Sequence, residues 1–136
     1  MFDLIHEFAV LGTACFMMAL ATVWYSPMLF GNRWMKEVGI TQEMIEAMEP
    51  QMWKHMVLTF VSYTGMLVLL ALVGVYAPVL GFEVWKVAVA ITFFVACAAV
   101  GPTLFEGRSR AYYLIRVGFY AVFIIIGTLM LQHWPW

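Results

Sequence analysis

The stretch VWYSPMLFGNRW, residues 23–34, lies where a long apolar segment ends. The residues before it, from Phe8 onward, are mostly aliphatic or aromatic, whereas this stretch combines aromatic rings with proline, glycine and arginine. Trp and Tyr rings and cationic side chains gather where a membrane-spanning helix meets the lipid headgroups. The stretch therefore predicts the end of a transmembrane helix at a membrane surface.

The whole chain has the composition of an integral membrane protein. Of its 136 residues, 65% are hydrophobic and 11% are charged, and the mean hydropathy is +0.91. A soluble domain has about 45–50% apolar and about 25% charged residues, so this chain could not cover its own surface in water. The length suits a single transmembrane domain, residues 1–136.

Four apolar runs are long enough to cross a bilayer, for which a helix needs about 20 residues. We place them at residues 8–30, 56–76, 85–105 and 112–131, and the middle of each run lacks Asp, Glu, Lys and Arg. The sequence therefore predicts an all-α polytopic membrane protein with four transmembrane helices in two hairpins.

The basic residues predict the orientation in the membrane. Six of the seven Lys and Arg residues fall on one face, namely Arg33, Lys36, Lys54, Arg108, Arg110 and Arg116. Only Lys86 lies on the face of the two termini. Cytoplasmic loops carry the excess of Lys and Arg, so we expect both termini outside and the two basic connections in the cytoplasm.

The first basic connection contains a predicted amphipathic helix at residues 41–49. Thr41 is a suitable N-cap and Pro50 a suitable stop. One face carries Met44, Ile45 and Met48, and the other carries Glu43, Glu46 and Glu49. An acidic face is poorly suited to anionic lipid, so we expect this helix to dock on protein.

Two short motifs suggest an internal repeat. PMLFGNR at 27–33 resembles PTLFEGR at 102–108, and each ends an odd-numbered span. Gly65 and Gly74 in the second span have the same spacing as Gly118 and Gly127 in the fourth. The pattern favours duplication of a hairpin, with the two copies parallel in the membrane.

Each motif by itself is typical of a helix end, in which proline bends the helix, glycine permits the exit turn and arginine binds headgroups. Two such ends on one face give some support to a shared cytoplasmic-side groove, while an ordinary helix end remains the leading interpretation of the motifs. The candidate surface comprises Trp24, Tyr25, Pro27, Phe30, Gly31, Arg33, Trp34, Pro102, Phe105, Glu106, Gly107 and Arg108. We expect Arg33 and Glu106, or Arg108 and Glu106, to form a salt bridge across the two motifs.

The motifs also carry a resemblance to a known family. VWYSPMLFGNRWM and LFEGRSRAYYLIRVGFY resemble the two signatures of the bacterial membrane family called domain of unknown function 1761. Arg116 departs from that pattern, which has a small polar residue such as Asn at this position. The resemblance implies four helices in a bacterial inner membrane, and it implies no activity and no catalytic residues.

The sequence offers little support for chemistry. The three His residues lie near the predicted interfaces without ligand spacing, and Cys15 and Cys97 lie inside apolar runs. Ser26 and Ser62 have no positioned His, and no carboxylate pair falls within a span. The net charge of −1 and the absence of a basic stripe argue against nucleic acid as a partner. We therefore expect no enzyme, no metal and no cofactor.

Two classes of function remain. The first is a structural or interaction subunit in the bilayer, either a homo-oligomer or an accessory subunit of another membrane protein. The alternative is a small transporter or binding protein for an apolar or aromatic small molecule. Eleven Met residues and 17% aromatic residues would suit a pocket of that kind, and they would equally suit packing and lipid contact.

Overall fold

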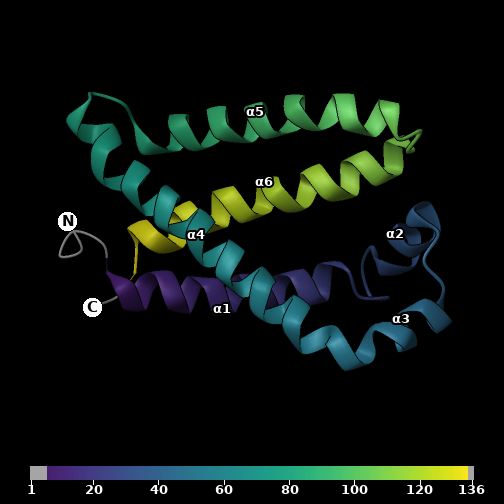
Figure 1. Ribbon diagram of the computed structural model, residues 1–136. Helices are drawn as coiled ribbons and strands as arrows, with labels where there is room; N and C mark the ends of the chain where they lie inside the picture. Colours follow the sequence, from purple (N-terminus) through teal and green to yellow (C-terminus); the bar gives the residue numbers. More distant parts are fainter. Residues whose placement is uncertain (1–5, 135–136) are drawn as a thin grey trace.

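The computed structural model describes residues 6–134, and within this range every regular element is helical (Figure 1). In chain order the elements are α1 (Glu7–Trp24), α2 (Gly31–Val38), α3 (Gln42–Met48), the 3-10 turn η2 (Glu49–Gln51), α4 (Met52–Val79), α5 (Val84–Phe105) and α6 (Arg110–Gln132). Within the described residues, four helical segments are long and apolar enough to cross a membrane, and they contain α1, α4, α5 and α6, respectively. The predicted fold class is therefore confirmed.

The four long helices form an antiparallel bundle with two distinct ends (Figure 1). α5 and α6 run side by side as a hairpin, while α4 crosses obliquely over α1 and α6. We call the end at which α1 begins and α6 ends the terminal end. The opposite end, which carries α2, α3 and the turn between α5 and α6, is the loop end.

The core lies between α1, α4 and α6. Its buried side chains come mainly from these three helices and comprise Val10, Ala14, Met17, Leu67, Leu70, Ala88, Phe119, Phe123 and Ile124. Gly127 of α6 allows α4 to cross closely, because a Cβ there would lie 3.0 Å from Leu67 and 3.5 Å from Leu70. Small residues at such crossings let membrane helices approach and gain van der Waals contact.

The turn between α5 and α6 keeps these helices adjacent. Gly107 has φ +64°, and the Arg108 and Gly107 amides donate to the carbonyls of Thr103 (2.9 Å) and Leu104 (3.1 Å). This is a Schellman ending, for which glycine is the preferred residue. The Ser109 hydroxyl then caps α6 by accepting a hydrogen bond from the Tyr112 amide at 3.2 Å.

The first helix ends earlier than the predicted span 8–30. α1 stops at Trp24, and a turn leads directly into α2. Pro27 has no N–H to donate to the Val23 carbonyl, which accepts instead from the Ser26 amide (3.2 Å) and hydroxyl (2.7 Å). Proline therefore ends the first helix here and does not merely bend it, while Pro102 lies inside α5.

The other helices follow the predicted ranges more closely. α5 and α6 coincide within two residues with 85–105 and 112–131, and α4 begins four residues before 56. α3 lies within 41–49, and Thr41 caps it by accepting from the Met44 amide at 3.3 Å. No residue of α3, which is described throughout, is buried, so its docking on protein stays a prediction about a partner. α2 was not predicted.

Candidate functional site

The turn between α1 and α2 depends on a glycine. Gly31 is buried, and a Cβ at this position would lie 2.6 Å from the carbonyl carbon and oxygen of Ser26. The Gly31 amide donates to the Ser26 carbonyl at 2.9 Å, and the Phe30 amide donates to the Trp24 carbonyl at 3.1 Å. These contacts fold the chain back so that α2 lies against α6.

Trp24 connects the end of α1 to α6. Its indole Nε1 donates to the Ile115 carbonyl at 3.1 Å. The ring also covers Gly118, where a Cβ would lie 3.3 Å from Cζ2 of the indole. Because tryptophan in a bundle needs a partner for its N–H, this hydrogen bond fixes the ring on α6.

Further rings join Trp24 in an aromatic cluster at the loop end. Phe30 lies 4.8 Å from Trp24, and Tyr25 lies 5.7 Å from Phe119 and 5.3 Å from Trp34, between ring centroids. The aromatic cluster comprises Trp24, Tyr25, Phe30, Trp34, Tyr63, Phe119, Tyr120 and Phe123. Tilted and edge-to-face ring pairs at these distances stabilise the fold by more than the burial of their apolar surface alone. The cluster therefore joins α1, α2, α4 and α6.

Glu37 of α2 makes polar contacts beside the aromatic cluster. Its carboxylate accepts from Nε of Arg33 at 2.9 Å, and its backbone carbonyl accepts from Nη1 of Arg108 at 3.2 Å. A hydrogen bond with the Ser109 side chain, followed by the charge of Arg33, lowers the pKa of Glu37. The hydrogen bond from Arg108 to the Glu37 carbonyl links α2 to the turn before α6.

The predicted salt bridges across the two motifs are only partly found. Of the two alternatives, the pair of Arg33 with Glu106 is wrong, because Arg33 pairs with Glu37 instead. Glu106 does pair with Arg108, at 3.6 Å, but both residues belong to the second motif. The physical reason is the helix α2, which places Glu37 one turn after Arg33. Contact between the two regions comes instead from Arg108 and the Glu37 carbonyl.

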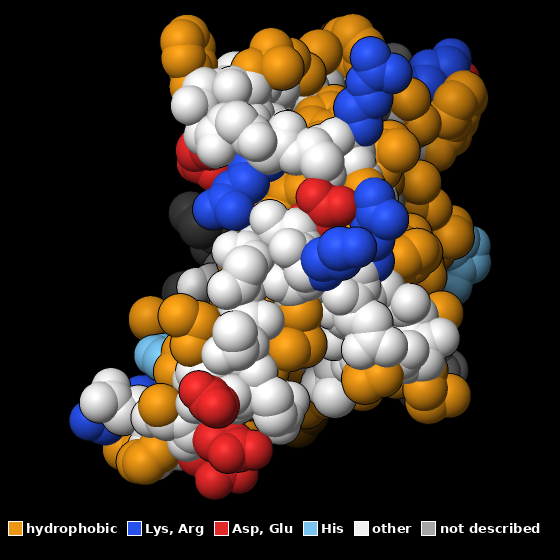
Figure 2. Space-filling model, turned by 90° about the vertical axis from the view of Figure 1, so that its right-hand side faces the viewer, with side chains coloured by type: hydrophobic (Ala, Val, Ile, Leu, Met, Phe, Trp, Pro, Cys, Tyr) orange, Lys and Arg blue, Asp and Glu red, His pale blue; other side chains and the backbone are white. Residues whose placement is uncertain are grey.

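The second motif leads into a pair of stacked arginines. The Arg108 guanidinium lies 5.5 Å and that of Arg116 5.9 Å from the ring centroid of Tyr112, and Arg116 Nη1 donates to the Tyr112 hydroxyl at 2.8 Å. Figure 2 looks onto this end and shows Lys and Arg side chains spread across it, with a separate acidic group at the lower edge over α3. Phe105 projects away with 96% of its surface exposed.

The structure divides the twelve predicted surface residues into different roles. Trp24, Tyr25, Phe30, Gly31 and Trp34 form the packed junction, which is structural. Arg33 and Arg108 meet at Glu37, while Gly107 supports the turn that Glu106 begins. Pro27, Pro102 and Phe105 are exposed. The two motifs therefore do not form one continuous surface of equivalent residues.

Sequence reasoning missed the residues of α6 that hold the junction together. Gly118 packs against the ring of Trp24, Phe119 packs against the ring of Tyr25, and Tyr112 contacts the guanidinium groups of Arg108 and Arg116. The spacing of Phe119 and Phe123, one helical turn apart, could have indicated an aromatic face on α6. In residues 6–134 no group of three or more His, Cys, Asp and Glu side chains is placed to hold a metal ion.

The model of a family described as "Protein of unknown function (DUF1761)" matches residues 8–132. The chain belongs to this family. The matched range includes all four long helices and both motifs, which confirms the resemblance seen in the sequence. No curated protein and no solved structure matches the chain.

Proposed function

We propose that this family member is a non-catalytic assembly subunit of a bacterial inner membrane, which pairs with a second copy of itself through the outer face of α5. In this proposal both termini face outward. The gathering of Lys and Arg at the loop end supports a cytoplasmic position for that end (Figure 2).

α5 is the least enclosed of the four long helices. It packs on α6 along one side and on α4, and its buried residues are Val84, Ala88 and Thr103. The opposite side presents Phe93 and Leu104, with 69% and 71% of their surfaces exposed. In a bilayer such a face contacts either lipid or another protein.

Small residues on this outer face favour another protein, and the pair Cys97 and Gly101, one helical turn apart, is the observation that carries the proposal. A Cβ at Gly101 would meet no atom within 4 Å among the described residues, so nothing described in the chain requires a glycine here. Glycine in a helix interior costs about 0.5–1 kcal/mol relative to alanine. Cys97, one turn earlier, is also exposed. Small residues four apart allow the backbones of two membrane helices to approach closely.

A two-fold axis along the membrane normal would make the two copies of α5 parallel. Cys97 of one copy would then face Cys97 of the other, close enough for a disulfide. Cys97 can therefore report on contact through α5. Cys15, which is also exposed but lies on α1, is the matched control.

The test is oxidative cross-linking in native membranes with copper phenanthroline. With Cys15→Ser, which keeps Cys97, we expect a disulfide-linked dimer on a non-reducing gel. With Cys97→Ser, which keeps Cys15, we expect monomer. A dimer formed through Cys15 and not through Cys97 would place the interface on α1 and overturn the proposal.

A second measurement does not depend on thiol chemistry. Gly101→Leu should weaken dimerisation in bicelles by about tenfold or more, because the larger side chain separates the helices. Gly65→Leu is the matched control, since a Cβ at Gly65 on α4 also meets no described atom within 4 Å. Equal effects of the two substitutions would contradict an interface on α5.

A further inference from the structure

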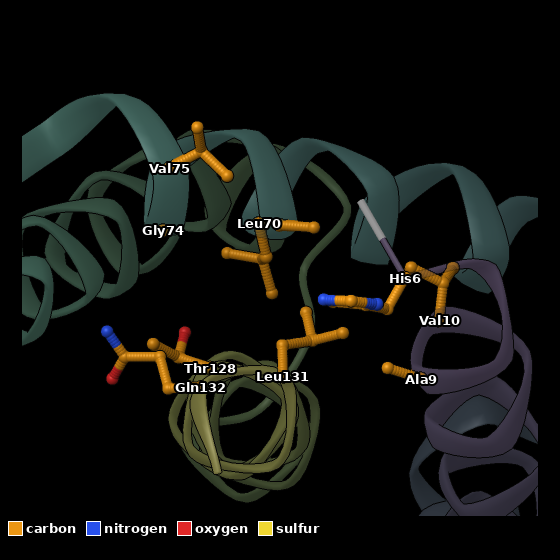
Figure 3. Close-up of a pocket in the computed structure, with 10 residues that line it drawn as sticks. His6, Ala9, Val10, Leu70, Gly74, Val75, Thr128, Leu131 and Gln132 are labelled. Atoms are coloured by element: carbon orange, nitrogen blue, oxygen red, sulfur yellow. The ribbon is translucent and has the colours of Figure 1, made fainter. Parts of the chain in front are cut away.

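A pocket of about 310 Å³ opens at the terminal end, between α1, α4 and α6 (Figure 3). It lies at the opposite end of the bundle from the aromatic cluster, and α5 takes no part in it. Its lining includes His6 and Val10 of the α1 end, Leu70 and Gly74 of α4, and Thr128 and Gln132 of α6. Ligand pockets start at about 300 Å³, so the space suits a small molecule.

The pocket results from the oblique course of α4 and from a missing side chain. α4 crosses α6 closely where Leu67 and Leu70 lie against Gly127. Gly74 follows Leu70 on α4 by one helical turn. A Cβ at Gly74 would meet no described atom within 4 Å. A larger residue at this position would extend into the pocket, so glycine keeps the space open.

Thr128 supplies an unpaired hydrogen-bonding group. The residue is 6% exposed, and its hydroxyl has no hydrogen-bond partner within the described range 6–134. Other helical threonines donate to the carbonyl four residues earlier; these are Thr22, Thr59, Thr64, Thr92 and Thr103. Figure 3 shows the Thr128 oxygen on the side of α6 that faces the pocket and α4.

A buried hydroxyl without a partner is unfavourable, and a ligand with a suitable polar group would supply the missing hydrogen bond. Thr13 is the second threonine with a buried, unpaired hydroxyl, but it does not line the pocket. Thr13 therefore gives a matched control for the effect of removing such a group.

The lining defines the chemical class of the ligand. The polar groups are the Thr128 hydroxyl, the His6 imidazole and the Gln132 amide, and the lining contains no Lys, Arg, Asp or Glu among the described residues. The remaining walls are aliphatic, as at Val10, Leu70 and Leu131. A charged ligand would be buried without a counter-charge, which is costly.

We infer that this pocket binds a small, neutral, mostly apolar compound that carries a hydroxyl or carbonyl group, which forms a hydrogen bond with Thr128. The apolar part of the compound fills the space between Leu70, Val10 and Leu131, and the polar group lies beside α6. This binding site is independent of self-association, because the pocket and the outer face of α5 share no residue.

The test uses 2-naphthol as the probe and naphthalene as the matched compound without a hydroxyl. Binding to protein in lipid nanodiscs is measured by saturation-transfer NMR, with empty nanodiscs as the reference for partition into lipid. We expect the protein to bind 2-naphthol more tightly than naphthalene. Thr128→Val should weaken 2-naphthol binding by about fivefold to tenfold and leave naphthalene unchanged, since one hydrogen bond is lost.

Three further variants separate a folding defect from loss of the site. Thr13→Val removes the other unpaired hydroxyl and should leave 2-naphthol binding unchanged. Gly74→Leu should block both compounds by filling the pocket, and Gly65→Leu should not. Equal binding of both compounds to all variants, at the level of empty nanodiscs, would mean partition into lipid only and would overturn the inference. If an acyl chain of the bilayer is the natural occupant, 2-naphthol and naphthalene should bind with equal affinity, and Thr128→Val should change neither affinity. That result would also overturn the inference.

Discussion

Two glycines on the loop side show how differently one residue type is used in this bundle. Gly31 is packed against the backbone of Ser26, which cannot move without breaking the turn. Gly118 is packed against the indole of Trp24, a side chain whose position depends on one hydrogen bond to Ile115. A backbone neighbour tolerates an added methyl group less well than the edge of a side chain does.

Gly31→Ala should therefore destabilise the protein. The added Cβ would lie 2.6 Å from the Ser26 carbonyl group, so the turn must open. Overpacking of this kind costs about 1–3 kcal/mol. Gly65→Ala is the control, because its Cβ would meet no described atom within 4 Å and the substitution favours the helix by about 0.5–1 kcal/mol. Thermal unfolding in detergent measures both variants, and an unchanged Tm for Gly31→Ala would contradict the proposed packing.

At the scale of elements, the short helix α2 connects the end of α1 to α6 through its side-chain contacts. It brings Trp34 against Tyr25 and places Glu37 beside Arg33 and Ser109. Its C-terminal Gly39 has φ +77°, which ends the helix and directs the chain toward α3.

The junction formed by Glu37 should depend on pH. Because the folded-state pKa of Glu37 is lowered, its charge stabilises the fold above the ordinary pKa of the unfolded carboxyl group, and this contribution is lost as the pH falls through the folded-state pKa. Glu37→Gln should lower Tm at pH 7 and should not differ from wild type below the folded pKa. Glu43→Gln on exposed α3 is the control.

Differential scanning fluorimetry between pH 7 and strongly acidic buffer gives the comparison. The Tm difference between wild type and Glu37→Gln should shrink as the pH falls, and that between wild type and Glu43→Gln should stay small. A Glu37→Gln difference that persists unchanged at low pH would show that the charge of Glu37 does not contribute.

At the scale of the whole molecule, each end of the bundle has an exposed position that can be labelled, so the orientation of the bundle in the membrane can be tested directly. Met44 of α3 is exposed at the loop end, and Leu80, between α4 and α5, is exposed at the terminal end. In a background of Cys15→Ser and Cys97→Ser, each position can carry a single cysteine.

Leu80→Cys should react with a membrane-impermeant maleimide added to intact cells, whereas Met44→Cys should react only after the membrane is opened. This result follows from the gathering of Lys and Arg at the loop end. Outside labelling at position 44 would reverse the proposed orientation and leave the fold unaffected.

The structure does not confirm the internal repeat. Gly118 and Gly127 of α6 face Trp24 and Leu67, whereas a Cβ at Gly65 or Gly74 of α4 would meet no described atom within 4 Å. The motif glycines also differ: Gly107 has φ +64°, while Gly31 begins a helix and lies against Ser26. Similar sequences at two helix ends thus serve different local geometries.

The amino-acid sequence by itself determined the membrane setting, the number of long helices and the cap of α3. These properties depend on composition and on contacts within a few residues, such as Thr41 with Met44 and the hydropathy of each run. For the same reason the family could be identified from two short motifs.

Only the tertiary structure decided which residues of those motifs are packed and which are exposed. The α6 partners of Trp24 and Tyr25 lie 91 and 94 positions further along the chain, and Arg108, which donates to the Glu37 carbonyl just before α6, lies 71 positions further. The pocket at Thr128 likewise depends on the angle at which α4 crosses α6. Contacts between distant segments arise from helix packing, which local pattern and composition do not specify.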